Sequence, residues 1–159
     1  NSQFENYSLS IVGDGQDRKA SERLVREYGI EEKVRFLGAL SYDEVNSLYD
    51  NADVFVFTSL RDTSGNVVLE AMSRGLPVIA INHHGVGEIV TDETGVLIDP
   101  VSYESVKQGF LRAIEQYAQN PYLMEKHGIA GRKRLETHYS WENNAKVLQD
   151  IYGRIVAEK

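Results

Sequence analysis

The stretch "TSLRDTSGNVVLEAMSRGLPVIA", residues 58–80, joins the end of one apolar run to a polar turn, a helical segment and a second apolar run. The two runs, "DVFVFTS" at 53–59 and "LPVIAI" at 76–81, are apolar on both faces, as strands buried in a parallel sheet are. A helix between two such strands forms a right-handed βαβ unit, the repeat of a Rossmann-like layer. Ligands bind such layers at the carboxyl ends of the strands, which places the turn at 59–66 on the ligand edge.

The same alternation of strand and helix continues over the rest of the chain. It predicts an α/β fold, a Rossmann-like doubly wound parallel sheet flanked by helices, with further helices at the C-terminus. Ser41 and Glu44 form a capping-box pattern, and Pro121 suits the first turn of a helix. The predicted strands are 7–13, 33–38, 53–59, 76–81 and 94–99; the predicted helices are 17–28, 41–52, 66–74, a single turn at 85–90, 103–119, 121–137 and 141–157.

Composition limits the classes of function. The 159 residues suit one compact domain, and 42% of them are hydrophobic, which is enough for a core. With 17 basic and 24 acidic residues the net charge is −7, which disfavours non-specific binding to nucleic acid or to an anionic membrane. The chain has no cysteine and no apolar run long enough to span a bilayer. It begins at Asn1 without a methionine or a signal peptide, so we expect a piece of a longer protein.

The turn before helix 66–74 has the features of an anion site. With Ser64 as the helix cap, the backbone amides of Gly65, Asn66 and Val67 are unpaired and face outward with the positive end of the helix dipole. Glycine at position 65 lets a phosphate approach closely. The turn therefore predicts a phosphate site.

Carboxylates stand on both sides of this turn. Glu70 is five residues beyond Gly65, about 7.5 Å along the helix axis, which is roughly the distance from a pyrophosphate to the ribose of its nucleotide. A nucleotide diphosphate-sugar laid across the helix end would bring ribose hydroxyls to Glu70 and hexose hydroxyls to Asp62, and carboxylates accept strong hydrogen bonds from hydroxyls. The spacing alone leaves two structural explanations open: a surface pair of Glu70 with Arg74, and a turn opened by Asp62.

Several segments resemble one enzyme family in the order in which they occur. They are "LSIVGDG", "VRFLGAL", "LYDNADVFVFTS", "VVLEAMSRGLPVIA", "GVGEIV", "TGVLIDP" and "YSWENNAKVLQDIY". The chain is similar to the C-terminal, donor-binding domain of the retaining group 1 (family 4) glycosyltransferases, one half of a GT-B fold. That family carries a Glu-x7-Glu motif, whose second acid binds the nucleotide ribose and whose first acid binds the transferred sugar. Glu70 matches the second acid. Asp62 stands where the family usually has glutamate, which we interpret as the variant of a subgroup.

The resemblance extends to the first glycine turn. Gly13-Asp14-Gly15 resembles the family's loop beside the diphosphate, although the G-x-G-x-x-G spacing of a dinucleotide site is missing. The segment from Gly38 to Leu40 matches the part of the family that lies near the base.

The resemblance also implies an activity for the complete protein. It is the transfer of a hexose-type sugar from a nucleotide diphosphate-sugar, with retention and without a metal, to a glycan or lipid-linked acceptor in cell-envelope or capsular polysaccharide synthesis. The acceptor-binding N-terminal domain, and the Arg and Lys that hold the leaving diphosphate, precede residue 1 in the family pattern. Residues 1–159 are thus expected to be a cytoplasmic donor-binding domain that binds nucleotide weakly and does not turn over by itself. Any contact with the inner membrane face would come through the missing half.

Two other classes of function stay open. A GT-B-like sugar-nucleotide epimerase or hydrolase needs additional acid–base groups, for which His83 and His84 are the candidates. The second is a non-catalytic module that binds nucleotide sugars. In that case Asp62, in place of the usual glutamate, would reflect evolutionary drift of the motif.

The remaining polar and aromatic residues suggest structural roles. Adjacent histidines make a poor metal chelate, so we expect a solvated loop at 83–84. Glu88 is expected to hold its loop through backbone amides. His127 and His138 are expected on the surface, and Trp141 is expected to pack beneath the last helix.

Overall fold

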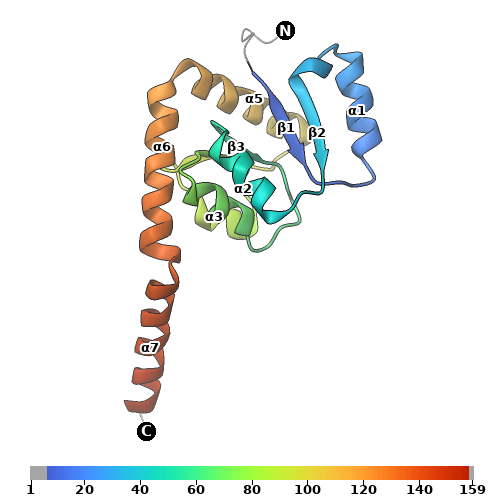
Figure 1. Cartoon of the computed structure of the whole chain (residues 1–159). Helices are drawn as coiled ribbons and strands as arrows, with labels where there is room; N and C mark the ends of the chain where they lie inside the picture. Colours follow the sequence, from blue (N-terminus) through green and yellow to red (C-terminus); the bar gives the residue numbers. More distant parts are fainter. Residues whose placement is uncertain (1–6, 158–159) are drawn as a thin grey trace. The chain divides into compact units, whose positions relative to one another are not determined.

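The computed structural model describes residues 7–157 of the chain. The chain divides into two compact units, with the boundary between Asn51 and Ala52. Each unit contains a parallel sheet and helices, so the expected α/β class with parallel strands is confirmed. Figure 1 shows the elements coloured along the sequence from blue to red and labels them where there is room.

The first unit is built on two parallel strands joined by a helix. Leu9 lies opposite Val34, and the register shifts between Ile11 and Val12. Ser41 caps the last helix of this unit and forms the predicted capping box with Glu44. The elements are β1 (Leu9–Val12), α1 (Arg18–Glu27), a short 3-10 helix η1 (Glu31–Lys33), β2 (Val34–Gly38) and α2 (Tyr42–Asp50).

The second unit contains a parallel sheet with strand order β3-β4-β5. The central strand β4 is buried at every position, as its continuous apolar run predicts. Strand β3 is shorter than the predicted 53–59. The elements of this layer are β3 (Phe55–Phe57), α3 (Asn66–Ser73), β4 (Val78–Ile81), α4 (His84–Ile89), β5 (Gly95–Ile98) and α5 (Tyr103–Gln119).

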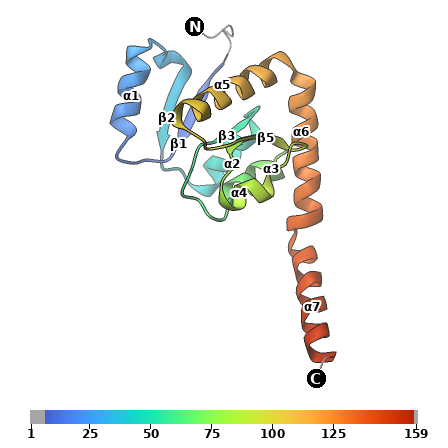
Figure 2. The ribbon, with the colours of Figure 1, turned by 180° about the vertical axis from the view of Figure 1, so that it is seen from behind.

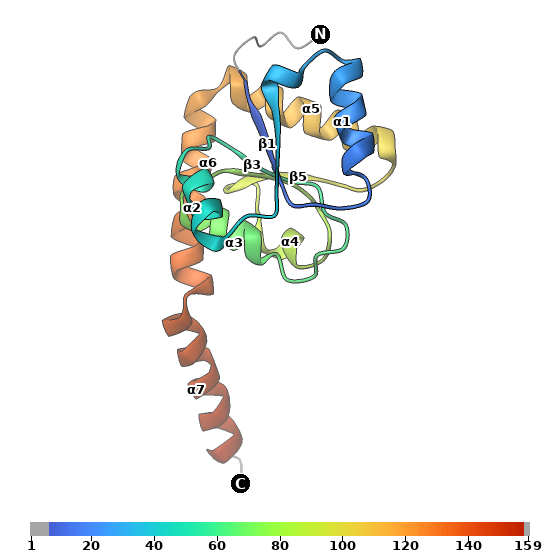
Figure 3. The same cartoon turned by 45° about the vertical axis from the view of Figure 1, so that its right-hand side comes forward.

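Alternate residues of β4 belong to two separate hydrophobic clusters. Val78 and Ala80 pack with residues of α3 and α4, while Ile79 packs with Ala113 and Tyr117 of α5. Because successive side chains of a strand point to opposite faces, α3 and α4 cover one face of the sheet and α5 covers the other (Figures 2 and 3). This arrangement places the turn between β3 and α3 at the carboxyl end of the sheet.

The C-terminal helices extend the second unit. α6 (Pro121–Arg134) begins with the predicted proline, and its Arg134 is followed by a π-helical segment, η2 (Leu135–Tyr139), and then by α7 (Trp141–Ala157). α7 runs away from the α/β layer of this unit (Figure 1). The expectation for Trp141 is wrong, because its side chain is 88% exposed and lies at the start of a helix that buries none of its residues. In the described part of the chain, the helices are too short or too polar to cross a membrane.

The expectation for His127 is also wrong. The side chain is 6% exposed, and its Nδ1 lies 2.8 Å from the hydroxyl of Tyr117 on α5. Burial lowers the pKa of His127 from its ordinary value and raises that of Tyr117, because each charged form would lose its hydration. The pair thus joins α5 to α6. His138 is exposed, as expected.

Candidate functional site

The loop between β3 and α3 is organised by Asp62. Ser59 Oγ accepts hydrogen bonds of 3.2 Å from the amides of Arg61 and Asp62. Asp62 Oδ1 then accepts from the Ser64 amide at 2.9 Å, from the Gly65 amide at 2.8 Å and from the Ser64 hydroxyl at 3.3 Å. The Gly65 bond, followed by the Ser64 bond, lowers the pKa of Asp62, because both stabilise the ionised carboxylate.

Asp62 therefore takes the capping role that the sequence suggests for Ser64. The N-cap residue of α3 is Gly65, which has no side chain to cap with, and the carboxylate three residues earlier binds its amide instead. The prediction of unpaired backbone amides at 65–67 is therefore wrong for Gly65, whose amide donates to Asp62. The amide of Asn66 makes no hydrogen bond with any described residue and lies at an exposed position. A charge-assisted cap suits this place, since an anion is favoured at the positive end of a helix.

Gly65 is required by backbone shape and by packing. Its φ is +66°, a left-handed conformation that costs an L-residue about 1 kcal/mol or more. A Cβ at this position would lie 2.7 Å from Ile89 Cδ1 and 3.4 Å from Val86 Cγ2, so α4 occupies the space. On the other side of the contact, a Cβ on Gly85 would lie 2.7 Å from the carbonyl oxygen of Thr63. Two glycines thus allow α4 to lie directly against the loop that Asp62 organises.

The two candidate carboxylates differ in how they are held. Asp62 is fixed through Oδ1, and its Oδ2 makes no hydrogen bond with a described residue. Glu70 is half-buried on α3, one turn beyond the start of the helix, and only its backbone carbonyl is used, by Ser73 Oγ at 2.6 Å. Within residues 7–157 the Glu70 carboxylate has neither a hydrogen bond nor an ion pair, so the expected alternative of a surface pair with Arg74 is absent.

The loop after β4 lies at the same edge of the sheet. His84 is the only described residue other than glycine with a positive φ, at 47°, and its ring centroid lies 3.8 Å from that of His83. His84 is exposed and His83 is half-buried. Asn82 Nδ2 donates to Asp99 Oδ1 at 2.7 Å, which joins this loop to the end of β5. A non-glycine residue in this region of φ is strained, and such strain concentrates at functional sites.

The glycine turn of the first unit is held by its own contacts. Gly13 has a φ of +110° and donates its amide to the carbonyl of Gly38 at 2.7 Å, while Asp14 Oδ1 accepts from the Gly15 amide at 2.8 Å. Arg18, which the sequence analysis missed, lies 3.4 Å from Asp14 Oδ2 and donates to the carbonyl of Phe36 at 3.3 Å. Its place four residues after Asp14 was the available signal. The turn at 13–15 and the adjoining end of β2 are thus brought together, with a cation beside them.

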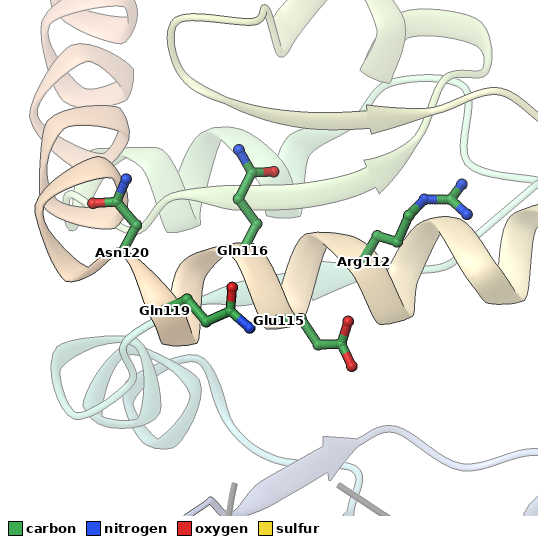
Figure 4. Close-up of a pocket in the computed structure, with 5 residues that line it drawn as sticks. All are labelled: Arg112, Glu115, Gln116, Gln119 and Asn120. Carbon is green, nitrogen blue, oxygen red and sulfur yellow. The ribbon is translucent and has the colours of Figure 1, made fainter. Parts of the chain in front are cut away.

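A shallow open depression lies elsewhere, along the second half of α5. Figure 4 shows its polar lining, which comes from one helix and its end: Arg112, Glu115, Gln116, Gln119 and Asn120. None of the residues that the sequence analysis selects lies there, and the site at the start of α3 is the better candidate.

Comparisons with known proteins show the family and the fold of the chain. The sequence pattern described as "Glycosyl transferases group 1" matches residues 1–134. The lipopolysaccharide core biosynthesis glycosyltransferase LpsE of Rhizobium meliloti is 31% identical over 152 residues, 95% of this chain and 42% of that protein. Sucrose-phosphate synthase of Thermosynechococcus elongatus is 28% identical with a TM-score of 0.77, over 99% of this chain and 40% of that one. HepE of Anabaena, solved with UDP and glucose, has the same fold, with a TM-score of 0.73 and 21% identity over 92% of this chain and 40% of that one. The chain spans less than half the length of the curated relatives that it matches.

Proposed function

Since the chain belongs to the group 1 glycosyltransferase family, we propose that residues 1–159 form the donor-binding domain of a retaining glycosyltransferase with GT-B architecture. The donor is a nucleotide diphosphate-sugar that carries a hexose, and no metal is required. The acceptor is a glycan or a lipid-linked glycan, bound by an N-terminal domain of the same polypeptide. The similarity to LpsE, a lipopolysaccharide core biosynthesis glycosyltransferase, supports a role in cell-envelope polysaccharide synthesis. The cytoplasmic location is part of the proposal and follows from the family resemblance.

The observation that carries this proposal is the pair of carboxylate groups around the start of α3. Glu70 presents two oxygens that no described residue uses, and Asp62 presents Oδ2 while Oδ1 is tied to the loop. Acceptor groups held in this way are suited to hydroxyl donors, which a ribose and a hexose both provide. Glu70 binds the ribose hydroxyls and Asp62 binds a hexose hydroxyl.

The phosphates lie against the start of α3, where Asn66 offers its amide and Val67 follows it in the first turn. In the first unit, Gly13-Asp14-Gly15 is by itself the turn that the family resemblance implies for a diphosphate contact. HepE of Anabaena, which has the same fold, holds UDP and glucose. In the reaction, the bond from the anomeric carbon to the diphosphate oxygen breaks and the acceptor oxygen bonds to the same face. The acceptor proton passes to the departing phosphate, so no protein base is needed.

The test is a titration of the full-length protein with nucleotide sugars that differ in base and in sugar. Glu70→Gln keeps size and removes charge, and we expect affinity for every nucleotide of the preferred base to fall by an order of magnitude or more, since a hydrogen bond to a charged group contributes about 1.5–3 kcal/mol. An unchanged affinity would refute the ribose assignment.

Two substitutions at Asp62 separate its roles. Asp62→Asn removes the charge but keeps an oxygen that can accept from the Ser64 and Gly65 amides. Asp62→Ala removes the charge and also this oxygen, and with it the cap of α3. We expect Asp62→Asn to lower affinity for the nucleotide sugar but to leave that for the nucleoside diphosphate unchanged. If both ligands weaken equally, Asp62 holds only the loop. Transfer that is undetectable with any acceptor, although donor binds, would favour the non-catalytic module.

A further inference from the structure

Arg134, the last residue of α6, reaches across to the end of α4. Its Nε donates to the carbonyl of Ile89 and its Nη2 to the carbonyl of Glu88, both at 2.9 Å. The last carbonyls of a helix have no partner within the helix and carry its negative end, so a guanidinium satisfies them well. A lysine ammonium also has several donors, but it lacks the rigid planar fork whose two nitrogens reach the two carbonyls separately. Glu88 is held through its own carbonyl, and not through its carboxylate as the sequence suggested.

Tyr139 completes this contact from the π-helical segment. Its hydroxyl donates to the same Glu88 carbonyl at 3.3 Å, and the Arg134 guanidinium carbon lies 5.8 Å from the centre of its ring. In a π-helix hydrogen bonds join residues five apart, which brings Tyr139 back over Arg134. An α-helix would turn the ring away. The π-helical geometry of η2 thus places the ring of Tyr139 against the guanidinium of Arg134.

Ile89 links this contact to the candidate site. Its carbonyl accepts the bond from Arg134, and its Cδ1 is the atom nearest to the place of a Cβ on Gly65. The amide of Gly65 is bound by Asp62. At the other end of α4, Gly85 lies against the carbonyl of Thr63. The six-residue helix α4, held at its far end by the Arg134 guanidinium and the Tyr139 hydroxyl, therefore forms the support beneath the loop that carries Asp62.

We infer that Arg134 is a positioning residue for the donor site: it fixes α4, and through Ile89 it fixes the loop from Asp62 to Gly65. This inference rests on the proposed function, since the loop is assigned there to the donor. Arg134 itself touches no donor. Its loss leaves the loop in several arrangements, and the donor must then select one of them, which weakens binding.

The experiment uses the full-length protein with Arg134→Met, and Arg132→Met as the matched control. Arg132 lies on the same helix, is exposed and pairs with Glu136 at 3.3 Å, away from α4. Calorimetry measures affinity for uridine, guanosine and adenosine diphosphates and their glucose esters. We expect Arg134→Met to weaken binding of the preferred ligand about tenfold and Arg132→Met to leave it unchanged. Equal affinities of the two variants overturn the inference.

A second measurement needs no ligand. Amide hydrogen exchange at Gly65 reports the Asp62 cap, and we expect it to become about tenfold faster in Arg134→Met but not in Arg132→Met. Ile89→Val removes Cδ1 and keeps the carbonyl, so it should also speed the exchange at Gly65. In the double variant Arg134→Met with Ile89→Val, we expect the exchange rate to rise by less than the product of the two single increases. Tyr117→Phe weakens the second unit elsewhere and should leave Gly65 exchange and affinity unchanged.

The outcomes separate this inference from the proposed function. If the wild-type protein binds none of the diphosphates, the proposed function fails, and exchange at Gly65 still decides whether Arg134 positions the loop. If exchange changes while affinity does not, the positioning is irrelevant to the donor and the inference fails. If Tyr117→Phe matches Arg134→Met in both measurements, the effect is one of general stability and the inference fails as well.

Discussion

Replacing Gly65 with alanine tests the packing of α4 against the loop. Gly65 has a φ of +66°, at which alanine costs about 1 kcal/mol relative to glycine. The new Cβ would lie 2.7 Å from Ile89 Cδ1 and 3.4 Å from Val86 Cγ2, so buried side chains must move. Overpacking of this kind costs about 1–3 kcal/mol. Together the two costs predict a loss of about 3 kcal/mol in the free energy of unfolding.

Gly75 offers a matched control at the other end of the same helix. Its φ is +76°, but the atom nearest to an added Cβ is the Gly128 carbonyl oxygen, 4.0 Å away, which is ordinary contact. Gly75→Ala therefore carries the conformational cost without the packing cost, and we expect a loss of about 1 kcal/mol. The difference between the two substitutions isolates the contact with α4.

The assay is urea unfolding followed by circular dichroism, with the slope of the free energy against urea compared between variants. Adding Ile89→Val to Gly65→Ala removes the crowding methyl group and should recover about 1 kcal/mol of the loss. If Gly65→Ala costs no more than Gly75→Ala, or if Ile89→Val destabilises the Gly65→Ala variant as much as it destabilises the wild-type protein, then α4 does not crowd position 65.

Three further predictions concern α5 and α6 of the second unit. Tyr117→Phe leaves His127 Nδ1 buried without its partner, and we expect the free energy of unfolding to fall by about 2 kcal/mol in the same urea assay. Because burial lowers the pKa of His127 in the folded state, the unfolded chain binds a proton first. The free energy of unfolding therefore has its full value above about pH 6.5 and declines as the pH falls from there through the lower pKa of the folded state. Urea titrations between pH 7.5 and 5 should show that this free energy changes less with pH in His127→Gln than in the wild-type protein. The exposed His138→Gln should leave its dependence on pH unchanged. Gly128→Ala would press a methyl group into the carbonyl of Gly75 and should destabilise by about 3 kcal/mol, measured as a lower melting temperature, while Gly153→Ala, with open space around it, should not.

The local pattern of the sequence predicts most of the secondary structure. The strands predicted at 76–81 and 94–99 and the helix predicted at 103–119 follow from apolar runs and helical spacing, and the capping box at Ser41 follows from two residues three apart. The helix predicted at 121–137 is α-helical to Arg134 and π-helical beyond it. The places of Asp62 before α3 and of Glu70 on it follow in the same way. Each of these features depends on neighbours within one or two turns.

The cap of α3 shows where local reasoning fails. Ser64 and Asp62 both stand within reach of the first amides of the helix, and the side-chain preferences for the two are alike. Gly65 in a left-handed conformation moves the cap position one residue onward, and the carboxylate at 62 then reaches the amide. The side chains of α4 leave no room for a Cβ at position 65, so this position must be glycine, which also adopts the left-handed conformation readily.

What the sequence by itself determined is the order of strands and helices, the acidic pair and the glycine turns, because these are written in spacings of one to eight residues. What only the tertiary structure decided is which groups meet: Gly65 with Ile89, Arg134 with the end of α4 across 45 residues, and His127 with Tyr117. The side chain of His127 is buried because α5 lies beside α6, whereas that of Trp141 is exposed because its helix, α7, buries none of its residues. Such contacts arise when the sheet brings separate segments together, and no local spacing encodes them.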